Sequence, residues 1–348
     1  MFTFKTSRIM LLGLAIGVVA LPTAAQTTLR YSDHQPLEGM RTTFIKEVLF
    51  KEIEKESEGR LKIDAHWDAE LSTGYDGLKT VGRGEKADIA VVVPEYMADA
   101  LPLHQLFKSF PVGPSGDDQV TLFRKIYADI PEFSEELAAN NAVEIFLSTG
   151  YPVGFFGTKP LNDLSEISGQ KWRSASFWHL DFLKSAGAQP IKMHWGKEIY
   201  NALDAGELDG IMVNIDSAYN LDLHKTATHA LVSKNLWLGH LYLIAMNQDT
   251  WNNLEAQDQQ AIARAAETAY SKLGDIMETS YTAMLNKLKS DGATIQALGH
   301  QGVIEWQETT DYNRIQKDWL AGQKEKGLED GESVLGRLTV IMNVANHH

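Results

Sequence analysis

The sequence contains no cysteine among its 348 residues. That absence excludes a disulfide framework, a thiol nucleophile, a thiolate metal site and a lipid anchor on an N-terminal cysteine. Positive charge is also scarce, since 32 Lys and Arg stand against 46 Asp and Glu and give a formal net charge of −14. A surface of that charge repels nucleic acid and anionic lipid, so an anionic ligand must be held by particular residues at a local site.

Long apolar runs are rare as well, and one of them opens the chain. Lys5 and Arg8 precede an apolar run over 9–21, and small residues follow at 23–25. About 13 apolar residues are too few for the roughly 20 that span a bilayer, so the pattern predicts a cleaved secretory signal peptide over 1–25. Cleavage leaves 30 Lys and Arg against the same 46 acidic residues, a formal charge of 30 − 46 = −16. We expect a periplasmic protein that is not embedded in a membrane.

Catalytic and metal-binding motifs are also absent. The sequence has no HExxH, no GxSxG and no phosphate-binding loop. His224 and His229 are five residues apart, whereas four places two ligands on one helix face. Asp216 and Ser217 are expected to cap a helix and not to act with His224 in hydrolysis. We therefore expect a protein that is not an enzyme and holds neither a metal nor a cofactor.

The first half of the chain alternates strand and helix patterns. Apolar residues recur at helical spacing over 39–56, and the run over 87–93, ADIAVVV, is continuously apolar, as in a strand buried on both faces. Such alternation predicts an α/β domain with a largely parallel sheet. We expect strands over 28–32, 61–66 and 87–93, and helices over 39–56 and 74–81.

The second half repeats this logic without repeating the sequence. Strand patterns near 143–149 and 240–247 are expected to cross between two lobes, and a nearly continuous helical pattern over 251–288 is long enough to run along both. The sequence therefore predicts a two-lobed α/β fold with crossover hinge strands and a long helix spanning both lobes. The other expected elements are strands over 151–158, 171–174, 209–213 and 241–246, and helices over 177–186 and 197–205.

These patterns divide the chain into two discontinuous lobes. We assign lobe I to residues 26–148 and about 240–279, and lobe II to residues 149–239 and about 280–335. Residues 336–348 are expected to form a C-terminal tail. The sequence contains no repeat and no low-complexity linker, so the crossover strands take the place of a linker.

Four short motifs follow one another in order along the chain. EKESEGRLKI begins at 54 and GEKAD at 84, the latter followed by Pro94 and Tyr96. DLSEISGQKWR then begins at 163, and GAQP at 187 is followed by EIYNALDAGELDG at 198. In order and spacing, these motifs resemble the extracytoplasmic solute-binding proteins of TRAP transporters, the DctP-like group, over nearly the whole mature chain.

The resemblance implies a periplasmic-binding-protein-like fold whose lobes close over one small ligand, usually an organic acid, and present it to TRAP membrane permease subunits. In that family the arginine that matches Arg173 forms a two-pronged salt bridge with the ligand carboxylate. The chemistry supports this role independently, because a guanidinium presents a planar fork of donors that fits a carboxylate. We expect Arg173 to hold a ligand carboxylate in a monomeric protein.

Further residues are candidates for the ligand site. His34 and Glu95 follow strand patterns, at the ends where open α/β sheets bind ligands, and Glu95 either pairs with an amino group on the ligand or is solvated surface. Trp195 either walls the site or packs between the lobes, and Asn214 follows the strand at 209–213 near a polar contact position of the family. The residues in or beside the crossover segments, which either line the cleft or belong to the core, are Phe155, Phe156, Trp237 and His240.

One departure from the resemblance bears on the ligand. Family members that bind sialic acid have a second arginine in the strand before the motif, where this sequence has Gly154 or Phe155. A single arginine favours a monocarboxylate over a dicarboxylate, while a sulfonate or an amino-bearing acid that uses Glu95 stays open. A periplasmic ligand sensor on the same scaffold is the alternative to delivery.

Overall fold

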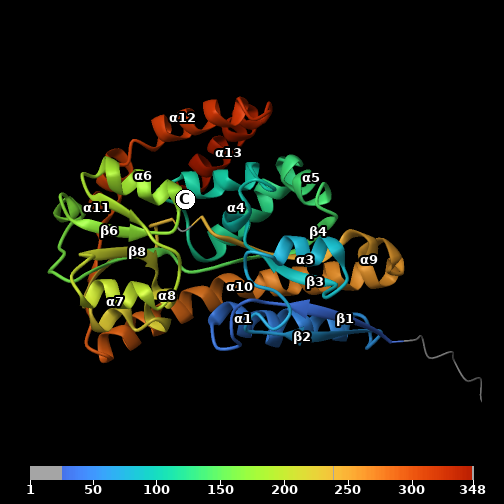
Figure 1. The fold of residues 1–348 in the computed structure, drawn as a ribbon. Coiled ribbons are helices and arrows are strands. Elements are labelled where there is room, and N and C mark those ends of the chain that lie inside the picture. Colours follow the sequence, from blue (N-terminus) through green and yellow to red (C-terminus); the bar gives the residue numbers. More distant parts are fainter. Residues whose placement is uncertain (1–25, 238, 347–348) are drawn as a thin grey trace, which may run out of the picture.

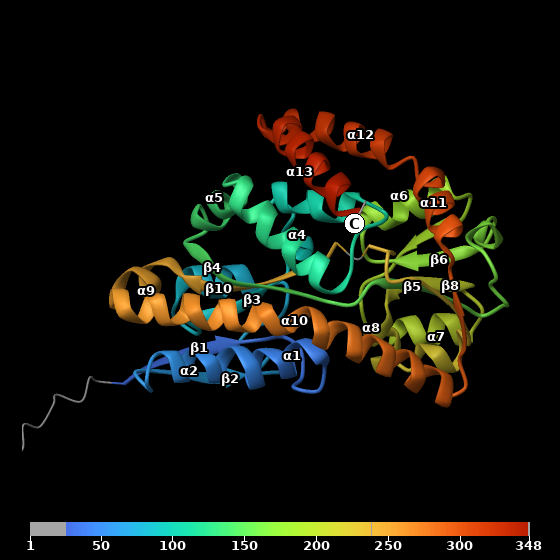
Figure 2. The same cartoon turned by 180° about the vertical axis from the view of Figure 1, so that it is seen from behind.

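The chain forms two sheets, each flanked by helices, in an α/β fold of two lobes (Figure 1, Figure 2). The structure is a computed structural model that describes residues 26–237 and 239–346. The predicted signal peptide, residues 1–25, lies outside the described residues. Across the two described ranges, no helix is both long and apolar enough to span a bilayer.

The first lobe is built on a five-stranded sheet with the order β2-β1-β3-β10-β4. Strands β1, β2 and β3 are parallel, as the alternation of strands and helices predicts, but β10 is antiparallel to both of its neighbours. All four residues of β3 are buried, in agreement with its apolar run. The strands are β1 Thr27–Ser32, β2 Leu61–His66, β3 Ile89–Val92, β4 Ala142–Thr149 and β10 Leu241–Asn247.

Helices cover this sheet on both faces. The predicted helix over 39–56 is one helical stretch with a π-helical centre, and α3 starts three residues later than expected. The helical elements are α1 Met40–Phe44, η1 Ile45–Phe50, α2 Lys51–Glu56, α3 Gly77–Arg83, η2 Pro94–Met97, η3 Leu103–Ser109, α4 Gly116–Asp129 and α5 Glu132–Ala138.

The second lobe is built on a six-stranded sheet with the order β11-β9-β5-β8-β6-β7. Strand β6 is parallel to β7 and β8, whereas β5 is antiparallel to β8 and β9. The strands are β5 Val153–Gly157, β6 Lys171–Ser174, β7 Gln189–Lys192, β8 Gly210–Asn214, β9 His229–Val232 and β11 Thr294–Ala297. The helical elements are η4 Leu164–Ile167, α6 Phe177–Ser185, α7 Glu198–Asp204, α8 Ile215–Asn220, η5 Leu223–Lys225 and α11 His300–Thr309.

The connections between the lobes are the predicted ones. Strand β4 of the first sheet leads through residues 150–152 into β5 of the second, and β9 leads through residues 233–240 back to β10. Helix α10, Ala256–Ser290, packs against α2 and α4 of the first lobe and against α8 and β11 of the second. The crossover strands and the long helix spanning both lobes are therefore confirmed.

Two details of the C-terminal third differ from the expectation. The helix predicted over 251–288 is broken, because Leu254 and Glu255 have extended backbone angles that separate α9, Gln248–Asn253, from α10. Residues 336–348, expected as a tail, belong up to Asn346 to helix α13, Gly331–Asn346, which packs against α4. Helix α12, Tyr312–Lys324, contacts α6 of the second lobe and η3 of the first.

The strand directions place loop residues from both lobes around one space. His34 follows β1, Glu95 follows β3, Ser176 follows β6 and Ser217 follows β8, and all four line the same cavity. Parallel strands present their carboxyl ends at one edge of a sheet, which is where open α/β sheets bind ligands. The fold thus directs the ends of both sheets toward one site.

Candidate functional site

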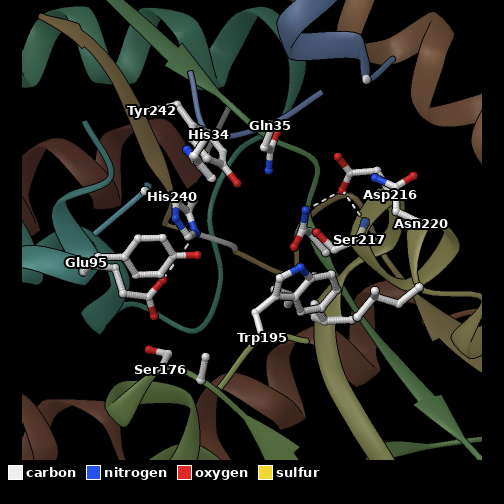
Figure 3. A pocket seen from close by; sticks show the side chains of 18 of the residues that line it. His34, Gln35, Glu95, Ser176, Trp195, Asp216, Ser217, Asn220, His240 and Tyr242 are labelled. Carbon is white, nitrogen blue, oxygen red and sulfur yellow. Dashed lines mark hydrogen bonds and ion pairs between the residues drawn. The ribbon is translucent and has the colours of Figure 1, made fainter. Parts of the chain in front are cut away.

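A cavity of about 440 Å³ lies between the two lobes and is lined by both. Figure 3 shows side chains from the first lobe, including Glu95 and His240, across from Trp195 and Asp216 of the second. A volume of this size suits a small organic molecule. The lining is rich in charged and aromatic groups. Which ligand it can bind depends on which of these charges are already paired within the protein.

Arg173 supplies a buried positive charge to this cavity from β6. The side chain of Trp172 packs over Gly210 so closely that a Cβ at Gly210 would meet the indole at 2.6 Å. Because successive strand residues point to opposite faces, that packing holds Arg173 on the other face. Arg173 is 2% exposed and its Nε and Nη2 both donate to the carbonyl oxygen of Met193, at 3.0 and 2.7 Å.

The Arg173 guanidinium forms no salt bridge with any carboxylate of the described residues. Burial lowers the pKa of Arg173 to about 10, with the carboxylate of Glu95 opposing that effect from a distance. Its Cζ atom lies 5.8 Å from the ring centre of Trp195, which is 39% exposed and so half open to the solvent. The second lobe therefore presents a desolvated cation beside an indole.

The first lobe carries a second buried arginine, whose charge is paired with a carboxylate. Arg41 donates from Nη1 and Nη2 to the two carboxylate oxygens of Asp33 at 2.6 and 2.8 Å, and Tyr31 donates to the same carboxylate at 2.6 Å. Burial alone would raise the pKa of Asp33, but the Arg41 guanidinium holds it below its usual range. Arg41 also lies over the ring of Tyr242, with Cζ 4.6 Å from the ring centre.

A second ion pair, between Lys108 and Glu95, also lies on the first-lobe wall of the cavity. Lys108 donates to Glu95 at 2.6 Å, and His240 Nδ1 lies 3.5 Å from the same oxygen. Burial acts to raise the pKa of Glu95, and Lys108 reverses this and keeps it below its usual range. Glu95 is therefore not solvated surface, and its charge is already balanced by a residue of the protein.

Three imidazoles face the cavity in their neutral form. Burial lowers the pKa of His34 to about 4 and holds the pKa values of His179 and His240 well below their usual range. Among the described residues, His34 Nδ1 and the Nε2 atoms of His179 and His240 have no hydrogen-bond partner. Buried polar atoms are usually paired, so these nitrogens can bind a ligand or water.

Asn214 and Asp216 form the polar corner of the second-lobe wall. Asn214 ends β8 and precedes α8, and its Nδ2 donates to Asp216 Oδ1, which also accepts from the backbone N–H of Ser217 at 2.9 Å. Asp216 thus lies in the first turn of α8 and is not its cap. Burial raises the pKa of Asp216. Figure 3 shows Asp216, Ser217 and Asn220 together at one side of the cavity.

Six of the nine candidate site residues line the cavity. They are His34, Glu95, Arg173, Trp195, Asn214 and His240.

Phe155 and Trp237 do not line the cavity. Phe155 pairs with Met212 inside the sheet, two residues from the cavity end at Val153, and packs edge-on against Trp306 of α11 with ring centres 5.1 Å apart. Phe156 is fully buried in the second-lobe core. Trp237 donates to the carbonyl of Phe107 at 2.6 Å, so its indole is held in the first-lobe core. Of the two alternatives that the sequence left open for these three residues, cleft or core, the structure places them in the core.

Several lining residues were missed at the sequence level. Arg41 lies in a helical pattern, where an arginine is normally expected on the exposed face. Lys108 lies in a 3-10 helix that the sequence patterns did not predict. A lysine within the apolar segment LHQLFKSF was the available signal. Other missed lining residues include Gln35, Tyr75, Tyr96, Ser176, His179, Asp216 and Tyr242.

Comparison with known sequences gives one family. The model of the family "Bacterial extracellular solute-binding protein, family 7" (DctP) matches residues 40–314. A solute-binding protein of Chromohalobacter salexigens is 23% identical over 265 residues, which cover 73% of this chain and 75% of that protein. The ectoine-binding periplasmic protein TeaA of Halomonas elongata is 24% identical over 242 residues, which cover 68% of this chain and 69% of TeaA.

Comparison with solved structures gives the same architecture. A TRAP solute-binding protein of Rhodoferax ferrireducens, in complex with copurified benzoate, superposes with a TM-score of 0.78 at 17% identity, over 92% of this chain and 99% of that one. TeaA in its apo state superposes with a TM-score of 0.77 at 18% identity, over 92% of this chain and 100% of TeaA. Likeness at this level of identity establishes the two-lobed fold.

Proposed function

Because this chain belongs to the bacterial extracellular solute-binding proteins of family 7, we propose that it binds a small organic acid between its lobes in the periplasm and delivers it to a TRAP permease. Members of this family are binding proteins and not enzymes. The observation that carries the proposal is Arg173, a buried cation on the cavity wall that forms no salt bridge within the described chain.

The chemistry of Arg173 favours a carboxylate. Both of the hydrogen bonds that it makes inside the protein go to one carbonyl oxygen, so part of the guanidinium fork remains for a ligand. A carboxylate matches the spacing of that fork, and the pair gains strength in a cavity from which water is excluded. A counter-ion also offsets the burial that lowers the pKa of the arginine. Benzoate, found with the Rhodoferax protein, is such a ligand.

The two lobes supply a route from binding to delivery. The ligand would contact Arg173 of the second lobe and the imidazoles of the first, and so would stabilise an arrangement in which the lobes are closed. Moving a closed-to-open ratio from 1:99 to 99:1 requires the ligand to prefer the closed form by about 5.5 kcal/mol. That preference has to come from contacts that form only on closure, such as those of the ligand with the first-lobe imidazoles, while Arg173 supplies affinity in both forms.

The test is a screen of small carboxylates by thermal shift, followed by calorimetry on Arg173→Met. A ligand at 100 times its Kd adds about 2.7 kcal/mol to the free energy of unfolding, which makes the screen sensitive. Loss of two charged hydrogen bonds predicts a rise in Kd of about a hundredfold to ten-thousandfold.

The matched control is Arg124→Met, because Arg124 is exposed and already pairs with Glu267. It should bind with unchanged affinity. The proposal fails if the screen finds only neutral sugars, or if Arg173→Met binds a carboxylate as tightly as the parent protein.

A further inference from the structure

The charged groups of the cavity wall divide into paired and unpaired ones. Arg41 is neutralised by Asp33, and Lys108 is neutralised by Glu95. Two charges remain without a salt bridge within the described chain, the guanidinium of Arg173 and the carboxylate of Asp216. Glu38, at the rim, is exposed and can be solvated without a partner. The wall therefore offers a ligand one positive and one negative group.

The carboxylate of Asp216 is held in place at one oxygen and open at the other. Its Oδ1 accepts from Asn214 Nδ2 and from the backbone N–H of Ser217, whereas Oδ2 accepts from no donor of the described residues. Burial raises the pKa of Asp216, and Arg41, the cation whose charge opposes this most, has two nitrogens committed to Asp33. A partly buried carboxylate in this position is stabilised by a cation that enters the cavity.

We propose that Asp216 accepts a cationic N–H group of the ligand, so that the ligand is a small zwitterion whose carboxylate pairs with Arg173 and whose nitrogen pairs with Asp216. This proposal rests on the proposed function and narrows its ligand class. It also moves the amino-binding role that the sequence suggested for Glu95 to Asp216, because Lys108 already neutralises Glu95.

The geometry of the wall supports two-point recognition. Asp216 lies in the first turn of α8, directly after β8, and Arg173 lies on the neighbouring strand β6, so one lobe presents both groups to the cavity. The indole of Trp195 lies beside Arg173 and can cover the apolar body of the ligand. A zwitterion satisfies both open charges at once, whereas a simple carboxylate leaves Asp216 without a counter-ion.

The experiment compares acids that are matched except for the cation. Suitable probes are proline with tetrahydrofuran-2-carboxylate, β-alanine with propionate, and 4-(aminomethyl)benzoate with 4-methylbenzoate. All six are screened by thermal shift, and the best pair is measured by calorimetry on the parent protein. We expect the zwitterion of that pair to bind at least tenfold more tightly than its partner.

The variant Asp216→Asn separates charge from structure, because the amide oxygen can still accept from Asn214 and Ser217. We expect this variant to lose the preference for the zwitterion. It should bind the acid that lacks the cationic nitrogen with the same affinity as the parent protein. Glu38→Gln, at the exposed rim, is the matched control and should keep the preference.

Two failures can be told apart. If acids without nitrogen bind and their zwitterionic partners do not, the ligand class is wrong. If Asp216→Asn keeps the preference for the zwitterion, Asp216 is not the group that binds the cation. In both cases the carboxylate function stands. If neither member of any pair depends on Arg173, as judged by Arg173→Met, the proposed function fails together with this inference.

Discussion

The two walls of the cavity differ in whether their charged side chains have counter-ions within the protein. On the first-lobe wall, Arg41 and Lys108 each form an ion pair with a carboxylate of the same lobe, and burial lowers the pKa values of the His34 and His240 imidazoles. On the second-lobe wall, Arg173 and Asp216 are desolvated without a counter-ion. The charges of the first wall are balanced by ion pairs within the lobe, whereas the two charges of the second wall have no counter-ion in the described chain.

This difference separates residues that hold the fold from residues that bind. Removing one partner of a buried ion pair leaves the other charge uncompensated, which is strongly destabilising. Removing a desolvated charge that has no counter-ion relieves the folded state of its desolvation. Two arginines in the same cavity should therefore respond in opposite ways to the same substitution.

The largest expected effect is on stability at Arg41. Arg41→Met leaves Asp33, which is 0% exposed, without its counter-ion, and should lower the free energy of unfolding by about 3 to 5 kcal/mol. Arg173→Met should unfold at a free energy no lower than that of the parent. Urea denaturation of both variants without ligand measures the contrast. Equal losses in the two variants would show that the walls do not differ in this way.

A second effect follows from the imidazoles. The folded-state pKa of His34 is about 4, below its unfolded value, so the folded protein disfavours protonation and loses stability as pH falls from about 6.5 toward 4. The loss from His34 alone reaches about 3 kcal/mol at pH 4. His179 and His240 act in the same direction, while Asp216, with its raised pKa, acts against them.

Urea denaturation at pH 7.5 and pH 4.5 measures this dependence, and His34→Gln should flatten it. Asp33 and Glu95 have pKa values below their usual range, so their contributions are lost mainly at more acidic pH. A parent protein that is equally stable at both pH values would contradict the assignment of buried neutral imidazoles.

The smallest expected effect distinguishes the aromatic partners of the two arginines. Trp195 is half open to the solvent beside Arg173, so Trp195→Ala should weaken ligand binding by roughly 1 kcal/mol, about fivefold, and leave unfolding unchanged. Tyr242, buried against Arg41, should show the reverse when changed to Leu, with a loss of stability. Calorimetry and urea denaturation on both variants would detect any exchange of these roles.

The sequence predicted correctly the features that a local pattern of residues determines, and it did not predict contacts between distant segments. The strand at 171–174 and its arginine were placed correctly because a short motif and the alternation of strand and helix fix both. The pairing of Arg41 with Asp33 and of Lys108 with Glu95 was not predicted, because each pair joins elements whose spacing in the sequence gives no periodic signal.

Errors in the prediction have similar causes. The sequence left Phe155 either in the cleft or in the core, because its depth along β5 depends on the register with β8. The break at Leu254 lies within a sequence of good helix formers, so propensity alone favoured continuity. The depth of a residue along a strand depends on strand register, and the point where a helix breaks depends on packing against distant segments.

The interleaving of the two lobes has a consequence for the order in which the protein can form. The first sheet contains β1 near the start of the chain and β10 at 241–247, and α13, which ends at Asn346, packs against α4 beside that sheet. A ribosome releases the chain N-terminus first, so β3 waits for its neighbour β10 until the whole second-lobe core sheet except β11 has been synthesised. Neither lobe can mature as an independent early domain, and correct assembly is a property of the finished polypeptide.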